Sequence, residues 1–330
     1  MKIAVLFGGP SPERDVSIAS GAQVIRSLRA DGHEVVAVDI SVGVLGPEGE
    51  DRIFRAALSG TPPAYEKGKS IISVLSSVIS TLEDVDLYFL ALHGVPGEDG
   101  SIQAFLDLAG LRYTGGGMKG SAVAMDKDLS KRLFRFADIP TPDWCLVSTP
   151  SFVPDGQLAY PAVVKPNNQG STIGLTVVKE PGLLKAAIEE AFKYDVEVIV
   201  EQYVEGREFT VGILDDMPLS VGEIIPQLGK VFNYESKYQK GGAIEIFPAG
   251  LEENQTGQLK DLALKAHKAL KIRSYSRVDF MMDADGRFWC LEVNTLPGMT
   301  ATSLLPQSAQ AVGIDFISLC RKICETAKGR

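Results

Sequence analysis

Two short polar triplets carry the strongest chemical signal in the chain. The triplets RVD, from Arg277 to Asp279, and EVN, from Glu292 to Asn294, lie on two successive strand-like stretches that are joined through the turn sequence DADGR. Because side chains alternate along a strand, each triplet places its two polar residues on one face. A hairpin would bring all four together, and carboxylate and amide oxygens suit Mg²⁺ beside nucleotide phosphates. A solvated hairpin face explains the same pattern taken alone.

A lysine followed by a glycine-rich loop gives a second signal. Lys165 ends the apolar run AVV and precedes NNQGSTIG, which contains Ser171 and Thr172. Backbone N–H groups in such a loop can point at anions, and the lysine adds a point charge. The order GxxxxGK[ST] is absent, so this is no Walker A loop. An ordinary hairpin turn is the competing interpretation. Lys127, in MDKDLSKR, is a weaker candidate, for which a surface lysine is the default.

Three further segments place polar groups after strand-like runs. Glu13, in GGPSPERDVS, is able to hold a substrate ammonium group or to serve the first turn of a helix. His93, in ALHGVPGEDGS, has Glu98 and Asp99 nearby to orient it, although a lone histidine is more often structural. The sequence PGMTATSLLP offers glycine N–H groups and the Ser303 hydroxyl, or simply a turn before a helix.

The elements that must position these residues fall into three regions. Residues 2–9, a helical segment and HEVVAVDI form a βαβ unit, and apolar runs at 86–92 and 111–113 extend it into an open parallel sheet. Ligands bind in the turns that follow such strands. We therefore assign residues 1–116 to an amino-terminal α/β domain.

The second and third regions have a different pattern. A single helix is predicted over 121–137, then a small β-rich module with the glycine loop and a helix near 182–194, which together give a domain of residues 117–200. Residues 201–330 form an α+β domain with four long strands and a helix near 254–270. The stretch 226–248 is polar and weakly periodic, which predicts a long functional loop.

Composition limits the class of function. With 45% hydrophobic and 23% charged residues, the chain is a globular protein without a membrane-spanning run. The formal charge of −9 argues against broad nucleic-acid binding. No secretion signal is recognisable, and four cysteines without CxxC spacing are interpreted as reduced core thiols, so we expect a cytoplasmic location.

Together these motifs resemble the ATP-grasp superfamily and, within it, the D-alanine–D-alanine ligases. The matching stretches occur in the same order from residue 1 to about residue 327 and are LFGGPSPERDVS, LHGVPGEDGSIQ, YTGGG with AMDKDLSK, VVKPNNQGSTIG, NYESKY, RVDFMM and LEVNTLPGMT. The resemblance implies a mixed α/β and α+β architecture, with an ATP-grasp fold behind a Rossmann-like open parallel-sheet domain. It implies ATP-dependent formation of a D-alanine dipeptide for peptidoglycan.

The resemblance also implies a nucleotide end of the site. ATP would lie between the second and third domains, with Lys127 and Lys165 at its phosphates and Glu201 and Glu208 near the adenosine. Two Mg²⁺ ions, or Mn²⁺, would be held by Asp279, Glu292 and Asn294.

At the substrate end, the resemblance implies that the first D-alanine is phosphorylated on its carboxylate and then attacked by the second. Glu13 would bind the first ammonium group and connect through Ser171 to Tyr238 on a lid. Arg277 and the Gly298 N–H would stabilise the oxyanion. The carboxylate of the second D-alanine would be bound by Lys237, Ser303 and the Leu304 N–H. His93 would lie in the same site.

Two alternatives remain beside this interpretation. One is an ATP-grasp ligase with another acceptor, such as D-serine, D-lactate or a different amino acid, although YESKY with Tyr238 favours an amino acid. The other is a nucleotide-binding regulator without turnover. Thr172, where serine is frequent in the family, is a departure whose effect on specificity is open. Family members are usually homodimers, so a homodimer is expected here too.

Overall fold

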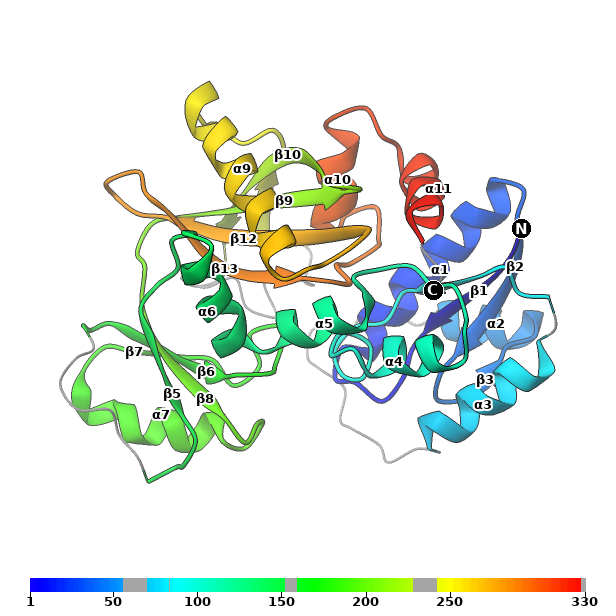
Figure 1. Cartoon of the computed structure of the whole chain (residues 1–330), viewed down its shortest axis with the longest axis horizontal. Coiled ribbons are helices and arrows are strands. Elements are labelled where there is room, and N and C mark those ends of the chain that lie inside the picture. Colours follow the sequence, from blue (N-terminus) through cyan, green and yellow to red (C-terminus); the bar gives the residue numbers. More distant parts are fainter. Residues whose placement is uncertain (56–69, 83, 152–158, 228–241, 328–330) are drawn as a thin grey trace.

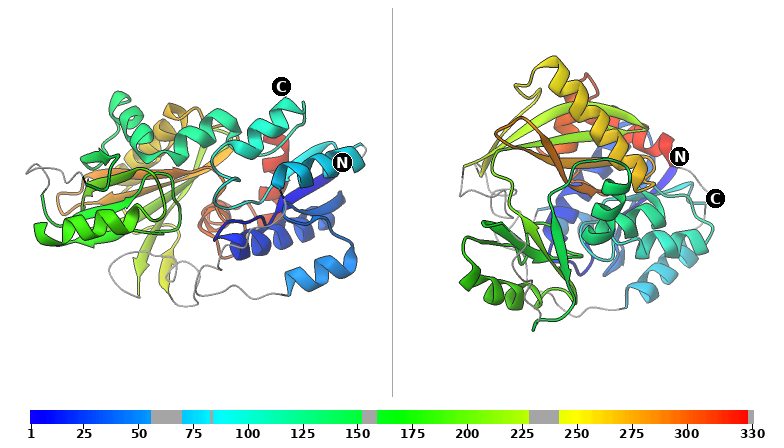
Figure 2. Two further views of the ribbon diagram at one scale, coloured as in Figure 1. Left: turned by 90° about the horizontal axis from the view of Figure 1, so that it is seen from below. Right: turned by 60° about the vertical axis from the view of Figure 1, so that its left-hand side comes forward.

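The computed structural model describes residues 1–55, 70–82, 84–151, 159–227 and 242–327. Three bodies, each built on its own sheet, make up the molecule (Figure 1). Figure 2 shows them from two other sides, with the helices of residues 101–136 along one flank of the molecule. Within the described ranges, no helix is long and apolar enough to cross a bilayer.

The amino-terminal body is an open sheet covered by helices. Its elements are β1 (Lys2–Phe7), α1 (Arg14–Ala30), β2 (Glu34–Asp39), β3 (Gly43–Val44), α2 (Pro47–Phe54), α3 (Ile71–Thr81), β4 (Leu87–Leu90) and α4 (Ser101–Leu108). The strand order is β3-β2-β1-β4, with β1 parallel to both neighbours and β3 an antiparallel edge. The parallel sheet is confirmed, but the strand predicted at 111–113 is reduced to an isolated bridge between Tyr88 and Tyr113, because the glycine turn that follows leaves the sheet.

The last helix of the chain completes this first body. Helix α11 (Phe316–Thr326) packs against α1, and its buried residues join the same hydrophobic cluster as β1 and β4. Arg321 Nε donates to an Asp31 carboxylate oxygen at 2.9 Å across the contact. In Figure 1 the red α11 lies beside the blue α1.

The central body is an antiparallel sheet of order β5-β8-β6-β7, backed by one helix. Its elements are β5 (Trp144–Val147), β6 (Ala162–Pro166), β7 (Thr176–Val178), η1 (Pro181–Leu183), α7 (Leu184–Ala191) and β8 (Val198–Gln202). The helices that lead into it are α5 (Gly117–Met125) and α6 (Lys127–Phe136). The single helix predicted over 121–137 is therefore wrong, because Asp126 leaves the helical conformation and its carboxylate caps α6 by accepting from the Leu129 N–H at 2.9 Å.

The carboxy-terminal body is a five-stranded antiparallel sheet of order β11-β10-β9-β12-β13. Its elements are β9 (Arg207–Leu214), β10 (Met217–Pro226), β11 (Ala243–Ile246), α9 (Glu253–Ala269), β12 (Tyr275–Met282), β13 (Phe288–Asn294) and α10 (Leu304–Gln310). The long loop predicted over 226–248 is corrected at its end, because residues 243–246 alternate in burial and pair with β10 as the edge strand β11. Residues 228–241 lie outside the described part.

Candidate active site

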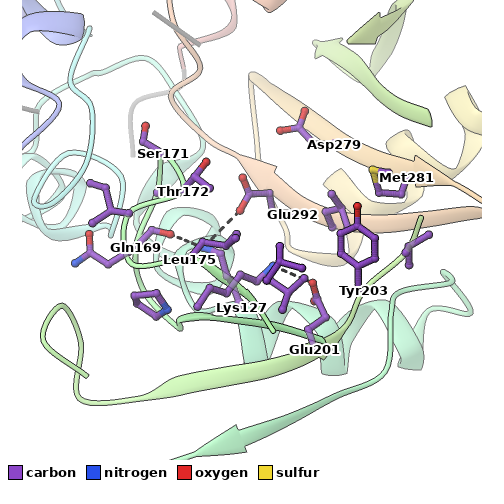
Figure 3. A pocket seen from close by; sticks show the side chains of 18 of the residues that line it. Lys127, Gln169, Ser171, Thr172, Leu175, Glu201, Tyr203, Asp279, Met281 and Glu292 are labelled. Carbon is purple, nitrogen blue, oxygen red and sulfur yellow. Dashed lines mark hydrogen bonds and ion pairs between the residues drawn. The ribbon is translucent and has the colours of Figure 1, made fainter. Parts of the chain in front are cut away.

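Two cavities meet at the glycine loop between β6 and β7. The first lies between the central sheet and the carboxy-terminal sheet, and the second opens toward α1 and the segment after β13. Gly170 and Ser171 line both cavities. In Figure 3 the labelled Glu201 and Tyr203 come from the central body, whereas Asp279, Met281 and Glu292 come from the opposite sheet. The glycine loop therefore forms part of the wall of both cavities.

The β12–β13 hairpin places its four polar residues as the strand alternation predicts. Arg277 pairs with Asn294, and Asp279 pairs with Glu292. The Asp279 carboxylate accepts from the Arg277 guanidinium at 3.0 and 2.7 Å and from the Asn294 amide at 2.9 Å. Thr210 on β9 also donates to it, at 2.7 Å. Asp279 is buried, so the alternative of a solvated hairpin face is wrong for this residue.

The donor set on this hairpin fits a hard divalent cation. Asp279 and Glu292 both line the first cavity, and the Asn294 side chain adds an amide oxygen at the border with the second. Among the described residues, no group of three His, Cys, Asp or Glu side chains forms a metal-binding cluster. Two carboxylates with an amide suit Mg²⁺, which completes its coordination with water and phosphate oxygens rather than with protein groups alone.

Both predicted lysines line the first cavity, and both are paired with glutamates. Lys127 Nζ donates to the Gln169 carbonyl at 2.6 Å and lies 3.5 Å from a Glu292 carboxylate oxygen (Figure 3). Lys127 is only 7% exposed, so the default of a surface lysine is wrong. Lys165 Nζ donates to Glu201 Oε1 at 3.0 Å. Both lysines that line this cavity are thus paired with carboxylates.

The glycine loop is both a hairpin connection and a cavity wall. Its strands β6 and β7 pair directly, and its start is tied to α6 by Asn167, whose side chain accepts from the Asp128 N–H at 2.8 Å. Ser171 and Thr172 have positive φ values of 51° and 63°. Such values are strained for residues other than glycine, most of all for a β-branched threonine, and strain of this kind gathers at functional loops.

Glu201 and Glu208 both line the first cavity, and their place near an adenosine stays a prediction. Glu201, on β8, is 2% exposed, and Glu208 lies on β9. Apolar side chains from both sheets complete the walls, as a flat aromatic base requires; they include Val163, Leu175, Val177, Tyr203, Val204, Met281 and Leu291.

In the second cavity, Glu13 faces the glycine loop. Glu13 stands at the N-cap position of α1, which confirms the predicted helix start, but its side chain makes no capping hydrogen bond to that helix. Ser171 instead donates a hydrogen bond to Glu13 Oε1. Glu13 is 6% exposed and lines the second cavity together with Gly170 and Ser171 of the glycine loop.

His93 lines the same cavity as a neutral imidazole. Burial lowers its pKa to about 4, and the charge of Arg277 acts in the same direction. Its Nε2 lies 3.1 Å from the Ser20 hydroxyl on α1. The expectation that Glu98 and Asp99 orient the ring is not what the structure shows, because the hydrogen bonds of His93 join it to α1 and to the Leu296 backbone.

Glu98 is a cavity residue whose importance the sequence did not indicate. Burial, and after it the charge of the nearby Glu13 carboxylate, raises the pKa of Glu98 to about 8. The Gly94 N–H donates to it at 2.7 Å. Glu98 is therefore largely protonated, and uncharged, at neutral pH. Its place in the HGVPGEDGS turn was visible in the sequence, but its burial was not.

The segment after β13 forms the far wall of the second cavity. Gly298, Ser303 and Leu304 line it, and Ser303 precedes α10. Thr300 N–H donates to the Ser303 hydroxyl at 3.1 Å, which fixes that side chain. A Cβ on Gly298 would lie 2.7 Å from the Ser303 oxygen, so only glycine leaves room here. Predicted site residues Lys237 and Tyr238 lie outside the described residues.

Two more residues escaped the sequence analysis. Glu245, on β11, lines the second cavity and accepts a hydrogen bond from Gln307 on α10. Lys131 lies behind the first cavity and contacts Glu201 at 2.6 Å. Its spacing of four from Lys127 places both on one helix face, which was the available signal.

Comparison with known proteins agrees with this geometry. Residues 2–116 match the model of the D-ala D-ala ligase N-terminus, and residues 133–325 match that of the D-ala D-ala ligase C-terminus. A curated D-alanine–D-alanine ligase of Nitratidesulfovibrio vulgaris is 41% identical over 100% of both chains. One from Gloeobacter violaceus is 40% identical, over 98% of this chain and 99% of that protein.

Solved structures give the same result. A crystal structure of D-alanine–D-alanine ligase from Bacillus anthracis complexed with ATP has a TM-score of 0.79 and 32% identity, over 99% of this chain and 97% of that one. A second structure of the Bacillus anthracis ligase has a TM-score of 0.80 and 35% identity, with the same coverage. With matching family models over both halves, full-length relatives and this fold, the chain belongs to the D-alanine–D-alanine ligase family of the ATP-grasp superfamily.

Proposed function

We propose that the protein joins two D-alanine molecules into D-alanyl-D-alanine, with ATP converted to ADP and phosphate through an acyl phosphate. The observation that carries this proposal is the meeting of two cavities at Gly170 and Ser171. One cavity has apolar walls and paired lysines suited to a nucleotide, and the other has carboxylates suited to an ammonium group. The phosphoryl donor and its carboxylate acceptor then face each other across the loop.

At the nucleotide end, Lys127 and Lys165 bind phosphate oxygens, while Glu201 and Glu208 lie at the adenosine. Asp279, Glu292 and Asn294 would hold two Mg²⁺ ions, for which Mn²⁺ is a chemical substitute. Bound there, the ions would supply charge neutralisation at the phosphoryl group that is transferred. Their ligands stand in register across β12 and β13, a rigid support that the fold provides.

At the substrate end, Glu13 binds the ammonium group of the first D-alanine, and the Ser171 hydrogen bond holds that carboxylate in place. The amine of the second D-alanine attacks the acyl carbon, and the bond to phosphate breaks as the peptide bond forms. Arg277 and the Gly298 N–H stabilise the oxyanion of this step. Arg277 is already oriented by its two hydrogen bonds to Asp279.

The second D-alanine is held by its carboxylate. The Ser303 hydroxyl and the Leu304 N–H line the cavity where it would lie, with Lys237 as a cationic partner and His93 in the wall. Tyr238 connects to Ser171 when the loop that carries it covers the site, and exclusion of water protects the acyl phosphate from hydrolysis.

We further propose that the dipeptide serves peptidoglycan synthesis in the cytoplasm and that the protein acts as a homodimer. Both follow from the family. Sedimentation of the purified protein tests the second, with a monomer at micromolar concentration as the contrary result.

Phosphate release from Mg²⁺-ATP with D-alanine, L-alanine, D-serine or D-lactate, followed by mass spectrometry of the products, tests the activity. We expect release with D-alanine alone and the D-alanine dipeptide as product. A mixed product would indicate the same ligase chemistry with a different acceptor. No phosphate release with any substrate would indicate a nucleotide-binding regulator without turnover.

A further inference from the structure

Lys131 is a fully buried lysine behind the nucleotide cavity, with 0% exposure. Its Nζ donates to the Thr141 hydroxyl at 2.6 Å and to the Pro142 carbonyl at 3.0 Å, and lies 2.6 Å from Glu201 Oε2. The ring of Trp144 has its centroid 5.1 Å from the same nitrogen. No part of this environment is solvent, so the ammonium depends on these groups for its charge.

Glu201 is shared between two lysines. Lys165 lies at 3.0 Å from its Oε1, and Lys131 at 2.6 Å from its Oε2. Burial alone would raise the pKa of Glu201, but the charges of Lys131 and Lys165 outweigh it and hold that pKa below its usual range. Burial lowers the pKa of Lys131, and Glu201 opposes this. The group therefore contains one buried anion and two cations.

The two lysines differ in their access to the cavity. Lys165 lines the nucleotide cavity together with Glu201, whereas Lys131 does not. An incoming phosphate can thus attract Lys165 but cannot reach Lys131. If Lys165 turned to a phosphate without a second cation nearby, Glu201 would remain as a buried charge with no counterion, which is strongly unfavourable.

We propose that Lys131 is a positioning residue for nucleotide binding: it is the permanent counterion of Glu201 and so allows Lys165 to exchange Glu201 for a phosphate. The inference rests on the proposed function, because it requires an anionic nucleotide in the first cavity. Lys131 acts through Glu201 and touches no substrate. In its absence Lys165 stays bound to Glu201, and the nucleotide must compete with that ion pair.

The test is the dissociation constant of Mg²⁺ with a non-hydrolysable ATP analogue, measured by calorimetry on the full chain. Lys131→Met should weaken binding about tenfold or more, because one buried charge pair then opposes phosphate binding. In the Glu201→Gln background, the same Lys131 substitution should change the affinity by less than about twofold, since no buried anion remains to hold Lys165.

Thr141→Val is the matched control. It removes a hydrogen-bond partner of Lys131 and the Thr141 hydroxyl bond to the Cys290 carbonyl, while it retains every charge. We expect its nucleotide affinity to remain within about twofold of wild type, even where its melting temperature falls. Equal weakening by Thr141→Val and Lys131→Met would indicate a purely structural role and overturn the proposal.

A measurement on the wild-type protein covers the case in which Lys131→Met fails to fold. In a crystal structure with the analogue bound, Lys165 should lie at the phosphates and beyond ion-pair distance of Glu201, with the Lys131–Glu201 pair retained. Retention of the Lys165–Glu201 pair beside bound nucleotide would contradict the inference. Failure of the wild-type protein to bind the analogue would instead contradict the proposed function.

Discussion

The two cavities handle charge in opposite ways. In the nucleotide cavity, each lysine is paired with a glutamate, as in Lys127–Glu292 and Lys165–Glu201. In the second cavity, Glu13 and Glu98 both line the wall, and burial together with the charge of Glu13 raises the pKa of Glu98 to about 8. Under the proposed function, the first cavity would exchange ion pairs to admit an anion, whereas the second would gain a counterion when an ammonium group binds.

The largest expected effect comes from a substitution in the nucleotide cavity. Glu292→Gln removes a proposed cation ligand and the partner of Lys127, so we expect phosphate release to fall on the order of 10³-fold. Turnover at saturating ATP and D-alanine is the measurement. Glu253→Gln, on exposed α9, is the control and should retain normal turnover. Comparable activity in Glu292→Gln would remove this residue from the cation site.

Glu13→Gln tests the second cavity, where the first D-alanine is proposed to bind. The variant loses a buried charge proposed to bind an ammonium group, so the apparent KM for D-alanine should rise roughly 10- to 100-fold. The affinity for the ATP analogue should be unchanged, because Glu13 lines only the second cavity. Asp15→Asn, in the first turn of α1, is the control. Normal dipeptide synthesis by Glu13→Gln would refute the assignment.

Glu98→Gln tests whether the crowding of carboxyl groups has an energetic cost. The folded pKa of Glu98, about 8, lies far above that of an unfolded chain. The contribution of Glu98 to the free energy of unfolding is therefore fully present below about pH 4.3 and is lost as the pH rises toward 8. We expect wild type to lose more thermal stability than Glu98→Gln between pH 5 and pH 8, by a few degrees in Tm. Parallel curves for the two proteins would show that Glu98 titrates normally.

The smallest effect concerns support of the cation site. Thr210→Val removes the hydroxyl that donates to Asp279 at 2.7 Å while it retains the side-chain shape. A single hydrogen bond of about 1 kcal/mol predicts a roughly fivefold higher Mg²⁺ requirement and little change in the KM for D-alanine. A titration of turnover against Mg²⁺ measures it. An unchanged requirement would mean that Arg277 and Asn294 orient Asp279 without help.

The two cavities also differ in how far the sequence predicts them. Alternation along each strand was sufficient to place the polar residues of each triplet on one face. The pairing of Asp279 with Glu292 also depends on a register shift between Asp279 and Phe280, which the sequence pattern does not report. The burial of Lys131 and Glu98 depends on how separate segments pack, which periodicity does not report. The split at Asp126 was missed because its carboxylate caps the second helix within a continuous helical pattern. The edge strand at 243–246 was missed because its exposed alternate positions resemble a loop.

The contact between α1 and α11 has a consequence for biosynthesis. The amino-terminal sheet emerges from the ribosome early, whereas α11 and the segment after β13, which pack around it, are synthesised last. The hydrogen bond from the Met299 N–H to the Ser20 hydroxyl, for example, joins residues 279 positions apart in the chain. Until then the nascent chain exposes apolar surface that only its own distant part can cover. The substrate cavity is consequently formed late, and a partly translated chain cannot assemble it.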